Sequence, residues 1–167
     1  NDIMKGCPAK LLTRVYKFDG TVLLEESIEL EIRAHSSDIA MSLNKKDLIG
    51  ENEPSEIFIK CDLLSDNETM STNNHFFLKA KELAIPKAEF EFDHKKVNDK
   101  YLITIQARSF LYQLHLQSSN VKGIYSNNYF EMLPNEVVTI EFEPTQYLDA
   151  NDDEVSFEIK SIYELMN

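Results

Sequence analysis

The chain is poor in several residue types, and each shortage excludes a class of function. Four glycines in 167 residues are too few to build the glycine-rich loops that cradle phosphates or dinucleotides, and neither fingerprint occurs. No serine nucleophile elbow is present either. Apolar runs are short, and none reaches the length that spans a bilayer. We therefore expect no cofactor of these kinds and no membrane contact.

Basic residues are also in short supply. Lys and Arg together number 17 against 29 Asp and Glu, which gives a net charge of -12. Such a charge repels a phosphate backbone, so we expect no nucleic-acid partner. A neutral ligand such as a glycan is not penalised by it. The hydrophobic fraction of 43% is high enough for a core, which predicts a folded chain rather than a disordered one.

Only two cysteines, Cys7 and Cys61, are present, and a disulfide framework in so small a chain would need more. Cys61 alternates with the apolar residues Ile59 and Leu63, as a core residue of a strand does. This pattern favours a buried free thiol. A bridge between the two cysteines remains the alternative.

Apolar and polar residues alternate with a period of two along most of the chain, which is typical of strands with one face on a core. Turn signals divide the sequence into about twelve to fourteen short strands, at the spacing found in β-sandwiches. Single helical turns are expected at 45–49 and 145–150, and a polar loop at 94–98. The expected strands include residues 11–18, 21–24, 28–33, 39–43, 57–63, 74–79, 101–107, 112–117, 138–142 and 155–159.

The alternation is interrupted once, at residues 82–87. Pro86 cannot donate a ladder hydrogen bond, and it restricts the backbone of the residue before it. We therefore expect an all-β fold of two tandem sandwich modules, residues 1–84 and 85–167. The first is expected to lack its opening strand, because residues 1–8 begin as though in the middle of a domain.

Metal-binding patterns fail on spacing. The acidic run near the C-terminus places Asp149, Asn151 and Asp153 at the first three ligand positions of a calcium loop. Glu154 then stands where the sharp turn needs Gly, and Lys160 stands where a bidentate Glu would coordinate. A solvated loop is the better interpretation. The histidines are not clustered as metal ligands need to be, so we expect no metal; they are His35, His75, His94 and His115.

Catalytic carboxylate pairs are not expected in this chain, because its acids fall mostly on outward strand faces and in loops, where surface charge explains them. One aromatic group is a candidate ligand site. Tyr125, Tyr129 and Phe130 surround Asn127-Asn128, and aromatic faces beside amides can stack on a sugar and hydrogen-bond to it. The competing and favoured interpretation is that these rings pack the core and anchor a corner of the sandwich.

With these motifs in place, the chain resembles the C-terminal accessory region of glycoside hydrolase family 2 β-mannosidases. The segment YSNNYFEMLPNE, Tyr125 to Glu136, is the most specific similarity. Asn135 departs from the pattern, since a turn glycine is common there in this family. The other similar segments are NDIMKG at 1–6, YKFDGTV at 16–22, FFLKAKELAIP at 76–86 and IKSIY at 159–163.

The resemblance implies two immunoglobulin-like sandwiches that follow a catalytic barrel in the same polypeptide. The parent enzyme would remove terminal β-D-mannose by a retaining mechanism, with two glutamates on the barrel. Neither glutamate belongs to this chain, so no catalytic residue is expected here. The resemblance also implies a location outside the cytoplasm, in a periplasm or a lysosome. The alternatives are a carbohydrate-binding module that contacts mannose-containing glycans and a cell-surface adhesion sandwich.

Overall fold

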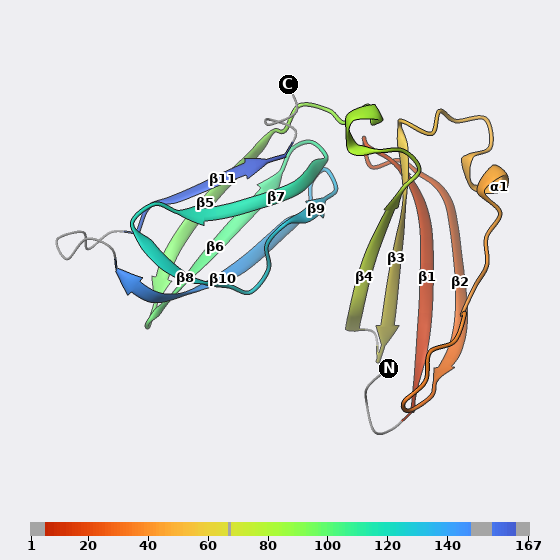
Figure 1. Ribbon diagram of the computed structural model, residues 1–167, viewed down its shortest axis with the longest axis horizontal. Helices are drawn as coiled ribbons and strands as arrows, with labels where there is room; N and C mark the ends of the chain where they lie inside the picture. The colour runs from red at the N-terminus through yellow and green to blue at the C-terminus, as the bar shows by residue number, and fades with distance from the viewer. Residues whose placement is uncertain (1–5, 67, 148–154, 163–167) are drawn as a thin grey trace. The chain divides into compact units, whose positions relative to one another are not determined.

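The computed structural model describes residues 6–66, 68–147 and 155–162. The chain is all-β and divides into two compact units, residues 1–84 and 85–167 (Figure 1). The predicted fold class is thus confirmed. Helical structure in the described part is limited to α1 (Lys45–Ile49) and the 3-10 turn η1 (Ala80–Glu82). No described helix is long and apolar enough to cross a membrane.

The first unit contains one antiparallel sheet with the strand order β2-β1-β3-β4. Its first hairpin turns at the predicted Asp19-Gly20 pair. Gly20 has a φ of 90°, which favours glycine, and the Asp19 carboxylate accepts a 2.8 Å hydrogen bond from the Thr21 N–H. The strands are β1 (Cys7–Lys17), β2 (Val22–Ile32), β3 (Ile57–Ser65) and β4 (Glu68–Phe76).

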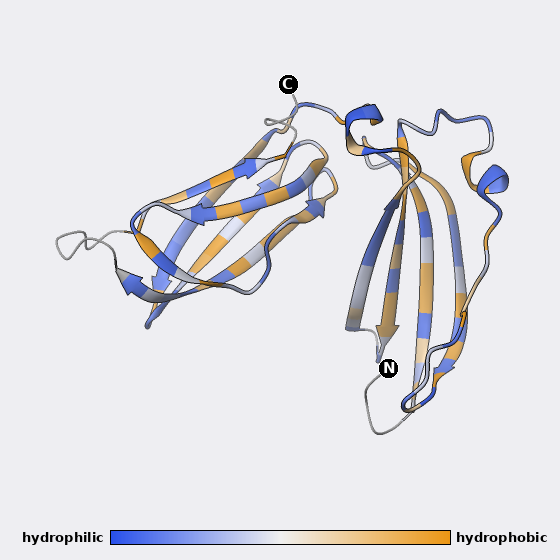
Figure 2. Ribbon diagram, in the orientation of Figure 1, coloured by the Kyte–Doolittle hydropathy of each residue, from blue (hydrophilic) through white to orange (hydrophobic). Residues whose placement is uncertain are grey.

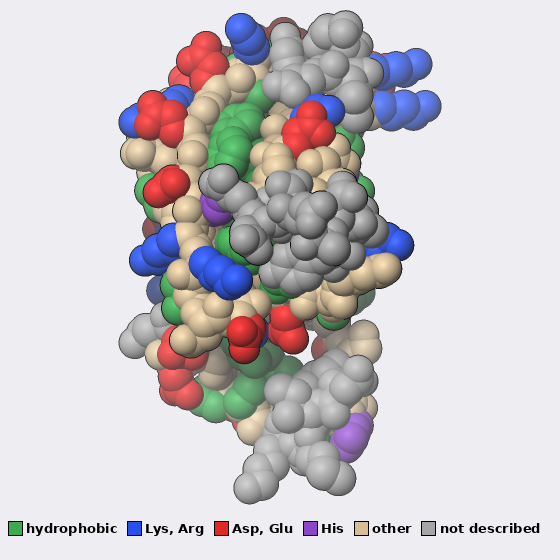
Figure 3. Space-filling view, turned by 90° about the vertical axis from the view of Figure 1, so that its left-hand side faces the viewer, with side chains coloured by type: hydrophobic (Ala, Val, Ile, Leu, Met, Phe, Trp, Pro, Cys, Tyr) green, Lys and Arg blue, Asp and Glu red, His purple; other side chains and the backbone are tan. Residues whose placement is uncertain are grey.

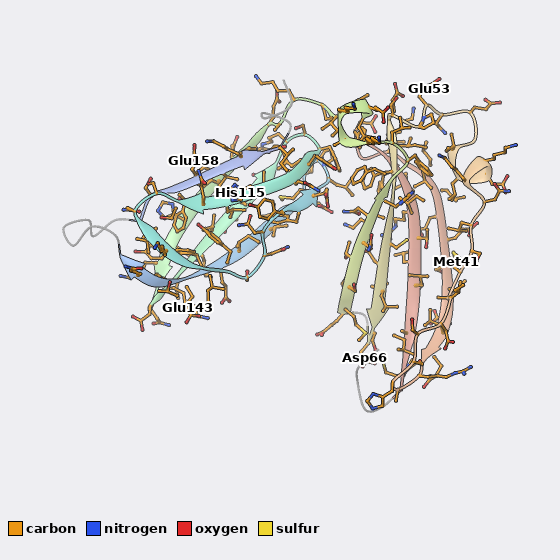
Figure 4. The ribbon with its side chains drawn as sticks, viewed as in Figure 1. Met41, Glu53, Asp66, His115, Glu143 and Glu158 are labelled. Carbon is orange, nitrogen blue, oxygen red and sulfur yellow. The ribbon has the colours of Figure 1, made fainter. Side chains whose placement is uncertain are left out.

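One face of this sheet is covered in part by the segment between β2 and β3. At the end near α1, Leu48 joins Val15 and Ile57 in a buried cluster. Further along the sheet, the Thr13 hydroxyl lies 3.9 Å from the sulfur of Met41, which Figure 4 labels. The predicted strand at 39–43 is wrong, because these residues pair with no strand. Of the alternating apolar residues, Met41 contacts the sheet, whereas Ile39 and Leu43 are exposed.

The second unit is a sandwich of two sheets, with the orders β5-β6-β10-β8 and β11-β7-β9. Both sheets contribute to one core, in which Phe142 and Phe157 meet edge to face with ring centroids 5.2 Å apart. Hydrophobic and hydrophilic residues alternate along these strands, as the alternating colours of Figure 2 show. The strands are β5 (Phe90–Val97), β6 (Lys100–Ala107), β7 (Leu111–Ser118), β8 (Val121–Tyr125), β9 (Phe130–Met132), β10 (Val137–Tyr147) and β11 (Phe157–Ser161).

Two local predictions for this unit are wrong. The expected loop at 94–98 is strand up to Val97, since β5 stays paired with β6 and His94 lies opposite Ile103. The chain turns at Asn98, which has a φ of 56°. The helical turn expected from Thr145 is also absent, because β10 continues to Tyr147 past an irregularity between Pro144 and Gln146. The rest of that expected turn lies outside the described residues.

Surface charge is mixed rather than separated. On the face in Figure 3, carboxylates and basic side chains are interspersed. Lys100, for example, lies 3.3 Å from Glu141 and 3.4 Å from Glu143. These pairs are exposed, so water and salt screen them and they contribute little to stability. Their main consequence is to neutralise locally a surface that is acidic as a whole.

Candidate functional site

The structure separates the three aromatic residues that the sequence grouped. Tyr125 packs on Phe142, with ring centroids 4.6 Å apart, and burial raises the pKa of its phenol to about 12. Phe130 is half-buried against the same core. Tyr129, in contrast, is 59% exposed. Of the three, Tyr129 is therefore the residue whose ring is available to a ligand.

The backbone around Tyr129 is held firmly although it carries no regular structure. Tyr129 has a φ of 60°, in the left-handed region that few non-glycine residues adopt. Its N–H donates to the Leu114 carbonyl at 2.9 Å. The preceding Asn128 side chain makes two hydrogen bonds to the backbone of Leu116. These bonds fix the loop to β7 and so determine where the Tyr129 ring lies.

The Tyr129 ring stacks on the imidazole of His115. The ring centroids are 4.7 Å apart and the planes are 15° from parallel. His115 belongs to β7, where it alternates with the buried residues Leu114 and Leu116. One face of the Tyr129 ring is covered by the imidazole, and the exposed fraction of Tyr129 indicates that the other face is open. We call Tyr129 and His115 the aromatic pair.

Polar side chains continue the same outward surface across β7 and β11. In the register of the two strands, Lys160 lies opposite His115 and Glu158 opposite Gln117. Glu158 accepts hydrogen bonds from Lys160, at 2.6 Å, and from the side-chain amide of Gln117. The Lys160 bond, and then that of Gln117, lowers the pKa of the Glu158 carboxyl. Figure 4 labels His115 and Glu158 on this sheet.

A second candidate lies on the first unit, where part of the apolar sheet face is open. A groove of about 700 Å³ runs beside the segment that follows β2. Ile39 lines it and is 86% exposed. Cys61 also lines it; its Sγ lies 3.7 Å from the buried Thr13 hydroxyl. We call this the open groove, and the lining residues used below are Leu11, Leu30, Ile39, Cys61, Leu63 and Met70.

Both cysteines are free thiols, as predicted. The prediction that Cys61 is buried is wrong, because this residue is partly exposed. It faces the side of the sheet that the segment after β2 covers only in part. The sequence pattern identified the correct face of the strand, but it could not show that this face is incompletely covered.

No group of three or more His, Cys, Asp or Glu side chains in residues 6–66, 68–147 and 155–162 is placed to hold a metal ion. The buried carboxylate of Asp62 accepts a 2.7 Å hydrogen bond from Thr72 and lies 3.6 Å from Arg14, so its partners are structural. The calcium-like residues Asp149, Asn151 and Asp153 lie outside the described part.

Protein-family models match both halves of the chain. Residues 1–82 match a model described as a mannosidase Ig/CBM-like domain. Residues 83–165 match the Ig_mannosidase model, described as an Ig-fold domain. The chain belongs to the immunoglobulin-like accessory domains of mannosidases. Comparison with curated protein sequences finds no match.

Solved structures agree with these mannosidase domains in fold. A β-D-mannosidase from Dictyoglomus thermophilum matches with a TM-score of 0.74 and 20% identity, over 96% of this chain and 19% of that one. An exo-chitosanase from Amycolatopsis orientalis, in complex with PNP-β-D-glucosamine, matches with a TM-score of 0.68 and 12% identity, over 96% of this chain and 23% of that one. The chain thus spans about a fifth of the length of these proteins.

Proposed function

We propose that the chain is the non-catalytic C-terminal accessory region of a β-mannosidase, and that it packs on and stabilises the rest of that polypeptide, including its catalytic barrel. The single observation that carries the packing role is the open groove on the first sheet. The parent enzyme would hydrolyse terminal β-D-mannose residues outside the cytoplasm, by a retaining mechanism with two glutamates on the barrel. The similarity to mannosidase domains supports this assignment.

The open groove favours burial against another layer of protein. A sheet with an apolar face is stable when a second layer covers that face. In the first unit, the covering segment reaches the sheet at Leu48 and Met41. Leu11, Leu30 and Leu63 line the part that stays open. Contiguous apolar surface of this kind marks an interface.

We assign the covering layer to the parent polypeptide. The mannosidase structure that resembles the chain is about five times as long, so a protein of this type has ample further chain for the purpose. The groove is lined by apolar side chains and by polar ones such as Glu31, Arg33 and Asp38, and we assign it to a folding interface because its leucine side chains gain from burial. Covering the groove would remove its leucine side chains from water, at about 25 cal/mol per Å² of apolar surface.

Cys61 provides a direct test, since its thiol lines the open groove. In a Cys7→Ser background, we would measure the alkylation rate of Cys61 in the chain alone and in the parent polypeptide. We expect fast labelling in the chain alone and labelling at least about tenfold slower in the parent, as burial limits thiol reactivity. Cys7 in a Cys61→Ser background serves as the matched control. Equal Cys61 rates in both proteins would refute the packing role.

The enzymatic half of the proposal has its own test. The chain alone and the parent polypeptide would each be assayed with an aryl β-mannoside. We expect hydrolysis by the parent and none by the chain. Hydrolysis by the chain alone would contradict its non-catalytic role, and failure of the parent to act on β-mannosides would contradict the assignment of substrate.

A further inference from the structure

We propose that the aromatic pair, Tyr129 on His115, is a binding platform for one sugar ring of a neutral glycan. The proposal concerns the second unit and requires no catalytic domain, so it stands apart from the proposed function. It rests on three features of the described residues: an exposed ring with one open face, a backbone that holds this ring in place, and hydrogen-bonding groups on the adjoining surface.

The open face of Tyr129 fits the apolar face of a pyranose. Tyr129 is 59% exposed, and His115 stacks on its other face at 4.7 Å. A sugar ring presents C–H groups on its faces and hydroxyl groups around its edge. Stacking on an aromatic ring buries the C–H groups, while the hydroxyl groups stay free to meet polar partners or water.

The platform is held in place before any ligand arrives. The left-handed backbone of Tyr129 is fixed by its 2.9 Å hydrogen bond to Leu114 and by the Asn128 amide. Ordering a mobile side chain would cost free energy on binding, and a ring that is already stacked avoids most of this cost. A strained backbone conformation that its surroundings maintain is also a feature of ligand sites.

Hydrogen-bonding groups adjoin the aromatic pair on β7 and β11. Gln117 follows His115 on the same face of β7, and Lys160 lies directly across the ladder from His115. Neighbouring strands are about 5 Å apart, which is about the width of a sugar ring. An amide, an ammonium and the Glu158 carboxylate thus lie on the strand surface next to His115, where they offer donors and acceptors to hydroxyl groups of a glycan that extends from the stacked ring.

Other ligand classes fit this surface less well. Lys160 and Glu158 form an ion pair 2.6 Å apart, so their charges cancel and give an anionic or a cationic ligand little advantage. The net charge of -12 repels nucleic acid. A single exposed ring is much smaller than the roughly 800 Å² that each partner contributes to a stable protein interface. A neutral glycan agrees with all three observations.

The test is an NMR titration of the chain with β-1,4-mannotriose, with cellotriose as the second sugar. We expect binding of about millimolar Kd, as an open platform for one ring would give. The shifted backbone amides should centre on His115, Gln117 and Tyr129. Binding of either sugar there supports the platform, and preference for one identifies the glycan. No shifts with either sugar, or shifts confined to other surfaces, would overturn the proposal.

Variants distinguish the loss of the Tyr129 ring from a loss of the fold. Tyr129→Asn removes the ring but suits a left-handed backbone, so we expect a folded protein with at least about tenfold weaker binding. Tyr129→Phe should retain binding. Gln117→Ala lies outside the loop that carries Tyr129, and it should also weaken sugar binding. Phe92→Thr, at a ring 40% exposed on β5, is the control and should change nothing. Unchanged binding by Tyr129→Asn would exclude the platform.

Discussion

The side-chain amide of Asn128 pairs with both backbone groups of Leu116. Its oxygen accepts the Leu116 N–H at 2.9 Å, and its nitrogen donates to the Leu116 carbonyl at 2.9 Å. This is the pattern of a peptide group in a ladder. It extends the pairing of β7 and β9, whose register shifts between Leu111 and Leu114. One side chain therefore replaces a strand residue and holds the loop that carries Tyr129.

Replacing Asn128 should destabilise the second unit. Asn128→Ala leaves the Leu116 N–H and C=O without these partners, and we expect a loss of about 1–3 kcal/mol in the free energy of unfolding. Urea denaturation measures it. Asn127→Ala is the matched control: Asn127 is exposed, and its side chain accepts a local hydrogen bond from the N–H of the next residue. Equal losses at the two positions would contradict the role of the Asn128 amide.

Replacing Tyr125 should not lower the free energy of unfolding, in contrast to replacing Asn128. The Tyr125 hydroxyl is buried and has no hydrogen-bond partner among the described residues. Removing an unpaired buried hydroxyl is neutral or favourable, so Tyr125→Phe should leave stability unchanged or raise it by up to about 1 kcal/mol. Thermal and urea unfolding provide the measurement. A clear loss of stability would show that the hydroxyl is bonded, and loss of sugar binding would return Tyr125 to the candidate site.

The same phenol should make stability depend on alkaline pH. Burial raises the pKa of Tyr125 to about 12 in the folded chain, whereas an unfolded tyrosine titrates near 10. The unfolded state therefore releases its proton first. The free energy of unfolding should fall as pH rises from about 10 to about 12. Tyr125→Phe should remove this part of the pH dependence and one late-titrating group from the tyrosinate absorbance curve.

Much of the fold was predictable because strand periodicity is local. Ile103, Ile105 and Ile140 are buried where the alternation places them. The errors arose where the apolar pattern and the pairing disagree. Residues 39–43 alternate without pairing, and 94–96 are polar yet paired on an edge strand. Hydrogen bonding between strands depends on register, which the pattern of a single segment does not contain.

The candidate site was predictable only in part. The sequence indicated Tyr129 but could not separate it from Tyr125, because the left-handed turn at Tyr129 breaks the alternation. Strand alternation places His115 and Gln117 on the outer face of β7, but the contact of His115 with Tyr129 depends on a loop packing back on β7. Asn135, which departs from the family pattern, has a φ of 69°. Asparagine tolerates such a backbone better than most residues do.

Gly123 should tolerate no side chain. A Cβ there would collide with the carbonyl oxygen of Glu143 and with the ring of Phe142, which is fully buried. We expect Gly123→Ala to cost about 3 kcal/mol, in the range of overpacking. Gly50→Ala is the control. At Gly50 a Cβ would lie 4.0 Å from the side-chain nitrogen of Asn52, so its φ of 58° is what opposes the change, at about 1 kcal/mol. Equal costs would contradict the close approach.

Replacing Ile39 should change stability differently in the chain alone and in the parent polypeptide. Ile39 lines the open groove and is 86% exposed, so in the chain alone Ile39→Ser should change stability by less than about 0.5 kcal/mol. If the parent polypeptide covers the groove, Ile39 becomes buried there, and the same change should cost about 2 kcal/mol or more. Thermal unfolding of both proteins makes the comparison.

Ile124 is the matched control for Ile39. It is also an exposed isoleucine, at 67%, but it belongs to β8 of the second unit. Ile124→Ser should have a small effect in the chain alone, and the open groove gives no reason for a larger one in the parent. A selective loss at Ile39 in the parent would identify the covered surface. If Ile39→Ser is equally mild in both proteins, the groove stays open in the parent and the packing role that rests on it is refuted.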